Sequence, residues 1–161
     1  MDDDLRARAA RVLDTCRIRS LKLATAESCT GGMVAAALTE IAGSSDVVER
    51  GFVTYSNAAK SELLGVPTAL IEAHGAVSGE VAAAMAAGAL SRAPVDLTVS
   101  VTGIAGPGGA TPGKPVGLVW LGIARRGGAV ATERHVFPGD RAAIRRASVL
   151  RALELLEAAA S

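Results

Sequence analysis

Aromatic side chains are scarce in this sequence of 161 residues, which contains two Phe, one Trp and one Tyr. Because half of the residues are apolar, the core has to be built from closely packed Ala, Val, Leu and Ile. Base stacking on single-stranded nucleic acid needs exposed aromatic side chains. The 17 Lys and Arg residues nearly balance the 16 Asp and Glu residues, so the chain also lacks the excess of basic residues typical of nucleic-acid binding. We therefore expect no nucleic-acid partner.

Cysteine and histidine are also rare, with two of each. Cys16 and Cys29 form neither a disulfide framework nor a zinc-ligand pattern with His74 and His135, so we expect no metal and no cofactor. No apolar run approaches the roughly 20 residues that cross a membrane. The charged N-terminus, MDDDLRARAARV, lacks the apolar centre of a secretory signal. The sequence predicts a cytoplasmic, reduced, single-domain protein over residues 1–161 that has no membrane partner.

Helical and extended patterns alternate along the first two thirds of the chain. Apolar residues recur at helical spacing in residues 3–17, and the β-branched segment 97–102 predicts a strand. Two strands joined by RRGG predict a hairpin, and Asp140 is placed to cap a long C-terminal helix. This order predicts an α/β fold, a three-layer α/β/α sandwich with a mixed, mostly parallel sheet and a C-terminal hairpin and helix. The other expected elements are strands at 21–25, 47–54, 116–124 and 129–137 and helices at 33–41, 57–64 and 80–90.

Small and hydroxyl-bearing residues separate the first expected strand from the helix at 33–41, in the sequence AESCTGG. Free N–H groups at the start of a helix can hold a phosphate or a carboxylate, and glycine lets a ligand approach the backbone. The glycine spacing matches neither a P-loop nor a dinucleotide-binding motif. A ligand site and a simple tight turn both remain open, and Glu27 either orients a ligand or satisfies the turn's backbone. The residues assigned to substrate binding here are Glu27, Ser28, Thr30, Gly31 and Gly32.

Cys29 in the same turn is a rival nucleophile, because a helix N-terminus lowers the pKa of a thiol. No histidine lies near it in sequence to act as a base. A small packed thiol is therefore the favoured interpretation.

A second candidate ligand segment is the Gly/Pro-rich loop that follows the strand at 97–102. Loops this long in a compact domain are usually functional, and Thr102, Gly103 and Gly106 could offer a hydroxyl and backbone N–H groups to a ligand.

Arg141 and Arg145 share a face of the C-terminal helix at i, i+4. They either pair with acidic side chains or meet a phosphate of the substrate.

The segment from Gly43 to Lys60 contains two serines, the single Tyr and one of only three Lys residues. A serine hydroxyl becomes a nucleophile when a base takes its proton, and a lysine with a lowered pKa can be that base. Spacing alone does not rank Ser44 against Ser45, and a surface lysine beside a capping serine is the alternative. Asn57 is expected to cap the helix that contains Lys60 and to bind substrate.

Taken in order, the motifs AESCTGG, AGSSDVVERGFVTYSNAAK, HGAVS, VTGIAGPGG and KPVG resemble the C-terminal domain of the competence/damage-inducible CinA family. The resemblance runs from about Leu5 to about Leu156. Family members with this domain are nicotinamide-nucleotide amidases. The resemblance therefore implies hydrolysis of nicotinamide mononucleotide to nicotinic acid mononucleotide and ammonia, with the family's catalytic serine at Ser45, its tyrosine at Tyr55 and its lysine at Lys60. The pyrophosphatase chemistry of the larger members' N-terminal domain is not implied.

The expected mechanism is an acyl-enzyme reaction without metal. Lys60 takes the proton of Ser45, directly or through Tyr55, and backbone N–H groups stabilise the oxyanion. A small-molecule nucleotide is the expected partner, and the Ala-rich helices suggest a homodimer.

Two alternative functions remain open. One is a catalytically silent nucleotide-binding or competence-related interaction module, and the other is an amidase for a related amide.

Overall fold

The computed structural model describes all residues, 1–161, and contains every predicted helix and strand. It adds one short helix that the sequence did not indicate, directly after Pro67. The elements are α1 (Asp3–Ile18), β1 (Leu23–Glu27), α2 (Met33–Thr39), the 3₁₀ turn η1 (Ser44–Asp46), β2 (Val48–Val53), α3 (Asn57–Leu64), α4 (Thr68–His74), α5 (Gly79–Arg92), β3 (Leu97–Gly103), β4 (Leu118–Arg125), β5 (Ala131–Val136) and α6 (Arg141–Ala160).

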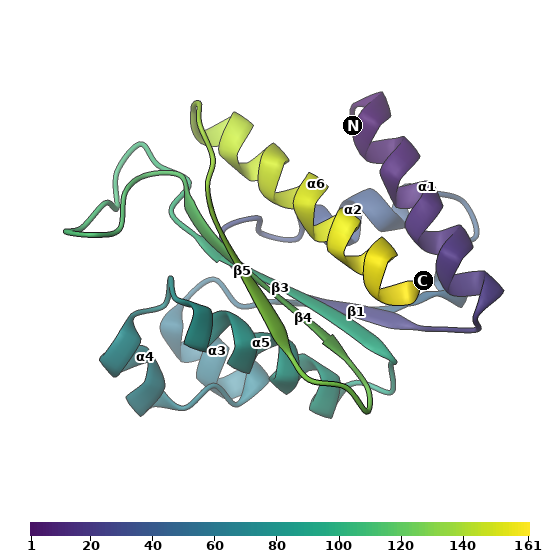
Figure 1. Cartoon of the computed structure of the whole chain (residues 1–161), viewed down its shortest axis with the longest axis horizontal. Helices are drawn as coiled ribbons and strands as arrows, with labels where there is room; N and C mark the ends of the chain where they lie inside the picture. The colour runs from purple at the N-terminus through teal and green to yellow at the C-terminus, as the bar shows by residue number, and fades with distance from the viewer.

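The five strands form one sheet in the order β2-β1-β3-β4-β5. β1 pairs in parallel with β2 and β3, whereas β4 is antiparallel to both β3 and β5. Helices α1, α2 and α6 cover one face of the sheet, and α3, α4 and α5 cover the other (Figure 1). The predicted three-layer sandwich with a mixed sheet, a C-terminal hairpin and a C-terminal helix is confirmed. No helix combines the length and the apolar character that crossing a membrane requires.

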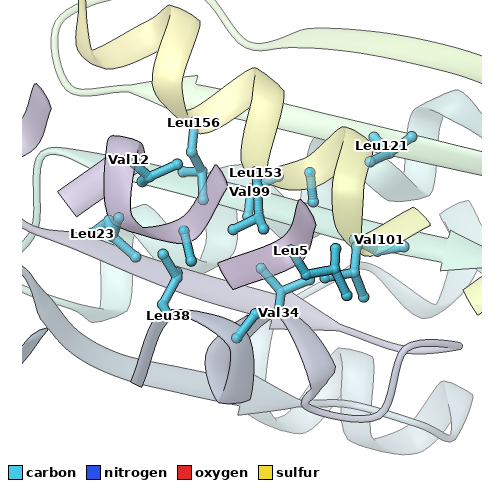
Figure 2. Packing of buried hydrophobic residues seen from close by; sticks show 14 of the residues in the cluster. Leu5, Val12, Leu23, Val34, Leu38, Val99, Val101, Leu121, Leu153 and Leu156 are labelled. Atoms are coloured by element: carbon cyan, nitrogen blue, oxygen red, sulfur yellow. The ribbon is translucent and has the colours of Figure 1, made fainter. Parts of the chain in front are cut away.

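The main core lies between the sheet and helices α1, α2 and α6. It is a cluster of 23 buried residues, all of them aliphatic or Cys, in which Val12, Leu153 and Leu156 from the helices meet Leu23 and Val99 from the strands (Figure 2). Small residues allow close contact on the other face, where a Cβ atom added to Gly122 would lie 2.6 Å from the Ala82 carbonyl oxygen. The prediction of a tightly packed aliphatic core is thereby confirmed.

The parallel strands end together at one edge of the sheet. Glu27 pairs with Val53 and with Val101, so the segments that follow β1, β2 and β3 leave the sheet side by side. The first turn of α6 reaches the same edge, where Arg141 donates a hydrogen bond to the Gly106 carbonyl oxygen (2.8 Å). Ligands of open α/β sheets bind beyond the carboxyl ends of such strands, so this edge is where a site is expected.

Candidate active site

A cavity of about 270 Å³ opens at this edge of the sheet. Its walls come from the turn after β1, the start of α3, the segment after α4 and the Gly/Pro-rich loop after β3. The residues that line it are Ser28, Cys29, Tyr55, Asn57, Lys60, Ala76, Val77, Thr102, Gly103, Ile104, Ala105, Gly106, Gly108, Gly109 and Arg141.

Lys60 lies at the inner end of this cavity and is only 1% exposed. Its Nζ donates to the Thr54 carbonyl oxygen (3.0 Å) and the Tyr55 carbonyl oxygen (3.3 Å), and it lies 3.1 Å from the Ser28 hydroxyl. Burial lowers the pKa of Lys60 below its ordinary value, because removal from water disfavours the charged ammonium. The structure thus holds this lysine in the environment that a neutral amine base requires.

The helix that holds Lys60 begins one residue earlier than Asn57 suggested. Ser56 is the N-cap of α3, and its hydroxyl accepts a hydrogen bond from the Ala59 N–H (3.0 Å). Asn57 is therefore the first helical residue, which corrects its predicted capping role. Its exposed side chain lines the cavity, as expected of a residue that binds substrate.

Ser28 is the hydroxyl that the fold brings to Lys60. It follows the last residue of β1, and its N–H donates to the Val101 carbonyl oxygen of β3 (2.9 Å), which fixes the backbone at the strand end. Its side chain is 8% exposed and faces the cavity. Ser28 is predicted to bind substrate, and its 3.1 Å distance to Nζ makes its hydroxyl the side-chain partner of this lysine.

Ser45 lies at the other end of the sheet, which corrects its predicted pairing with Lys60. It is an exposed residue of η1, just before β2, and the neighbouring Asp46 pairs with Arg17 of α1 (2.9 Å). Leu23, the first residue of β1, pairs with Val48 at this end. The five residues of β1, at about 3.3 Å each, put some 15 Å between the two ends. Neither Ser45 nor Ser44 can therefore give a proton to Lys60.

Tyr55 touches Lys60 only through its main chain. Its phenol oxygen accepts a hydrogen bond from Arg141 Nη2 (3.2 Å), and the side chain is 62% exposed at the mouth of the cavity. The predicted proton relay from Ser45 through this phenol is therefore absent. Arg141 instead joins Tyr55 to the Gly106 carbonyl oxygen, which links α6 to two walls of the cavity.

Several residues assigned to substrate binding lie outside the cavity lining and support it from behind. The Glu27 carboxylate accepts hydrogen bonds from Thr30 Oγ1 (2.7 Å) and from the N–H groups at the start of α2. Arg145 donates from Nε to the Cys29 carbonyl oxygen (3.2 Å). Gly31 and Gly32 have positive φ angles of 57° and 103°, so they serve the turn that joins β1 to α2. Glu27 and Thr30 are 0% exposed, which corrects their predicted ligand contacts. Gly31, Gly32 and Arg145 also lie outside the cavity lining, and their contacts with a ligand stay a prediction.

Residues of the Gly/Pro-rich loop line the cavity, and their contact with substrate stays a prediction. Thr102 uses its hydroxyl to hold the Ala76 carbonyl oxygen (2.8 Å), so it shapes the wall, while Gly103 and Gly106 bring backbone into the cavity. The N–H groups of Ala105 and Gly106 donate to no carbonyl or side-chain oxygen, and neither does the N–H of Cys29 beside Ser28. These groups are available to an oxyanion or a phosphate.

The Cys29 thiol is buried in the cavity wall, and its burial raises its pKa to about 11. A thiol with this pKa is uncharged at neutral pH and is a weak nucleophile. The interpretation of Cys29 as a packed thiol agrees with this environment.

Sequence reasoning missed the apolar part of the lining, which includes Ala76, Val77 and Ile104. Small aliphatic side chains carry no chemical signal in a sequence. The segment HGAVS carries the family resemblance but no predicted role. It reaches the cavity directly after the short helix α4, which the sequence also did not indicate.

Comparison with known proteins gives a family match over nearly the whole chain. A family model described as the CinA C-terminal domain matches residues 5–160. The nicotinamide-nucleotide amidohydrolase PncC of Escherichia coli strain K12 is 48% identical over 155 residues, which are 96% of this chain and 94% of that protein.

A CinA-like protein of Mycolicibacterium vanbaalenii is 60% identical over 137 residues, which are 85% of this chain. The chain spans only about a third of that longer relative (32%). Among solved structures, the competence/damage inducible protein CihA of Agrobacterium tumefaciens superposes with a TM-score of 0.96 at 49% identity, covering 98% of this chain and 96% of that one.

Proposed function

Because the chain belongs to the CinA C-terminal domain family, we propose that it is an amidohydrolase that converts nicotinamide mononucleotide to nicotinic acid mononucleotide and ammonia. The observation that carries this proposal is the 3.1 Å contact between the Ser28 hydroxyl and the buried Nζ of Lys60. A hydroxyl paired with a neutral lysine is an established arrangement for acyl transfer. The choice of substrate is supported by relatives of similar length that are named nicotinamide-nucleotide amidohydrolase.

Lys60 is the general base in this mechanism. A neutral amine has two N–H bonds and one lone pair, and Nζ has two carbonyl acceptors and one hydroxyl around it. When the two N–H bonds point to the carbonyl oxygens of Thr54 and Tyr55, the lone pair is left for the proton of Ser28. The lowered pKa of Lys60 makes this neutral form accessible.

In the first half-reaction, Ser28 Oγ attacks the carbon of the carboxamide while Lys60 takes its proton. The negative charge on the amide oxygen meets free N–H groups, for which Cys29, Ala105 and Gly106 are the candidates. The C–N bond then breaks, Lys60 returns the proton to the leaving nitrogen, and ammonia departs. Ser28 is left as an ester of the nicotinate group.

In the second half-reaction, water attacks this ester. Lys60 takes a proton from the water, and the proton passes to Ser28 Oγ as the ester bond breaks. The carboxylate product leaves and the hydroxyl is restored. No metal or cofactor takes part in these proposed steps.

Substrate recognition uses both the apolar and the cationic parts of the cavity. Ala76, Val77 and Ile104 offer a surface for the flat pyridine ring, with the carboxamide directed to Ser28. Arg141 lines the cavity and carries the positive charge suited to the phosphate. Fixing the nucleotide end in this way orients the amide for attack.

The substrate is tested by measuring ammonia release from nicotinamide mononucleotide, nicotinamide riboside and nicotinamide, with a chelator present. We expect the mononucleotide to be hydrolysed with the highest kcat/KM, because only it has a phosphate for Arg141. Arg141→Ala should lower kcat/KM for the mononucleotide by a larger factor than that for the riboside, because both lose the bonds to Tyr55 and Gly106 but only the mononucleotide loses a phosphate contact. Binding of the mononucleotide without ammonia release from any amide would contradict the enzyme proposal and favour the binding module. Ammonia release from a different amide alone would show that the substrate is that amide and not nicotinamide mononucleotide.

We also propose that the protein is a cytoplasmic homodimer. The free thiols of Cys16 and Cys29 suit a reducing compartment, and the exposed apolar side chains of Val53 and Leu63 could lie in an interface. Sedimentation equilibrium gives the mass of the assembly directly, and a monomer at micromolar concentration would contradict the dimer.

A further inference from the structure

Glu27 is a buried carboxylate that the proposed chemistry does not use. It is the last residue of β1 and is 0% exposed. A carboxylate is seldom buried without compensating hydrogen bonds. Three groups donate to it, namely Thr30 Oγ1 at 2.7 Å, the Val34 N–H at 2.8 Å and the Ala35 N–H at 3.1 Å.

These contacts tie the nucleophile turn, which we define as residues 28–32, to helix α2. The N-cap of α2 is Gly32, which has no side chain to accept the free N–H groups of the first turn. Glu27 accepts two of those N–H groups from a position five residues upstream, and it also holds the hydroxyl of Thr30. The turn contains Gly31 and Gly32, and a glycine backbone can adopt many conformations. The shape of the turn therefore depends on the hydrogen bonds to Glu27.

The same residue is joined to the base through the main chain. The Glu27 carbonyl oxygen accepts from the Thr54 N–H (2.8 Å), and the Thr54 carbonyl oxygen accepts from Lys60 Nζ (3.0 Å). Successive side chains of a strand point to opposite faces, so Glu27 points under α2 while Ser28 faces the cavity. Glu27 thus contacts the turn that holds Ser28 through its side chain, and the Thr54 backbone that holds Lys60 through its main chain. It does not line the cavity itself.

We propose that Glu27 is a positioning residue for amide hydrolysis, which holds the nucleophile turn so that Ser28 Oγ stays at Lys60 Nζ. This inference rests on the proposed role of Ser28 as the nucleophile. A carboxylate is required because all of its partners are donors. The amide of a glutamine would turn an NH₂ group toward a backbone N–H, which leaves one donor unpaired and pushes the turn away from α2.

The test compares Glu27→Gln with Glu133→Gln, its matched control. Glu133 is also held by several hydrogen bonds, from Arg151 and His135, but it lies on β5 and does not line the cavity. Three quantities are measured for each folded variant: kcat, KM for nicotinamide mononucleotide, and the rate at which a fluorophosphonate labels Ser28, read by peptide mass spectrometry. Labelling reports the alignment of the nucleophile without any need for the substrate.

We expect Glu27→Gln to lower kcat and the labelling rate together by about 10- to 100-fold, as a displacement of about 1 Å would, with KM within about threefold of the parent. Glu133→Gln should keep both rates within about twofold. Thr30→Val removes one donor and should lower both rates by a smaller factor, whereas Thr30→Ser keeps the hydroxyl and should restore them.

Unchanged kcat and labelling in Glu27→Gln would overturn the proposal, as would an equal loss in Glu133→Gln, which would indicate general destabilisation. If Glu27→Gln does not fold, the comparison of Thr30→Val with Thr30→Ser decides in its place. A parent that is labelled at Ser28 but releases no ammonia would contradict the proposed substrate, and the labelling rates would still test Glu27. A parent whose Ser28 is not labelled would overturn both the nucleophile and the positioning role.

Discussion

Lys60 owes its chemical character to its neighbours at the scale of single residues. Three oxygen atoms surround Nζ, two of them carbonyl oxygens that only accept hydrogen bonds, and burial disfavours the ammonium form. The sequence indicated Lys60 as a base because it is one of three lysines and lies near the only tyrosine. Its partner Ser28, 32 residues away along the chain, could not be predicted, because only the pairing of the strands brings the two together.

The pH dependence of turnover follows from the lowered pKa of Lys60. The neutral amine is the active form, so protonation at lower pH removes activity, and kcat/KM should rise with pH. The rise should level off above an apparent pKa that lies below the ordinary lysine value of about 10.4. Lys60→Arg, which stays protonated, should lower kcat by about 10²- to 10⁴-fold.

The control for this experiment is Lys22→Arg, because Lys22 is exposed and far from the cavity lining. It should keep the activity and the pH profile of the parent. An ionisation at the ordinary lysine pKa, or parental activity in Lys60→Arg, would show that Lys60 is not the base.

At the scale of the elements, helix α3 shows which of its ends the local sequence predicts. Its end was predicted correctly, because Gly65 takes up the left-handed conformation at φ 66°. Its predicted start was wrong by one residue, since Ser56 and Asn57 are both good cap residues and only the backbone decides between them.

Helix α4 was missed because its seven residues bury a single side chain, Ile71, which leaves no periodic pattern to detect.

Adjacent substitutions at the start of α3 should separate folding from function. Ser56→Ala removes the N-cap hydrogen bond to Ala59 and should lower the free energy of unfolding by about 1 kcal/mol. Asn57→Ala removes a side chain that lines the cavity but caps nothing, so it should change KM more than stability. Urea denaturation and steady-state kinetics of the two proteins would check this, and the reverse pattern would restore Asn57 as the cap.

At the scale of the whole molecule, the sheet decides which motifs can act together. The motifs AESCTGG and VTGIAGPGG were placed correctly at strand ends, and parallel pairing brings those ends to one edge (Figure 1). The sequence predicts one site in the segment from Gly43 to Lys60, but β2 lies inside it. A strand separates its two ends by its own length, so Ser45 and Lys60 face opposite edges of the sheet. The prediction failed because closeness in sequence does not show whether the chain crosses the whole sheet between two residues.

The most direct measurement of the central claim is ammonia release from nicotinamide mononucleotide by Ser28→Ala and Ser45→Ala beside the parent protein. Each variant removes one hydroxyl, at opposite ends of the same sheet, and circular dichroism shows that each is folded. The Ser28–Lys60 site predicts that Ser28→Ala loses at least about 10³-fold in kcat, as expected for the loss of a nucleophile, while Ser45→Ala stays within about twofold of the parent. Retained turnover in Ser28→Ala together with its loss in Ser45→Ala would contradict the account.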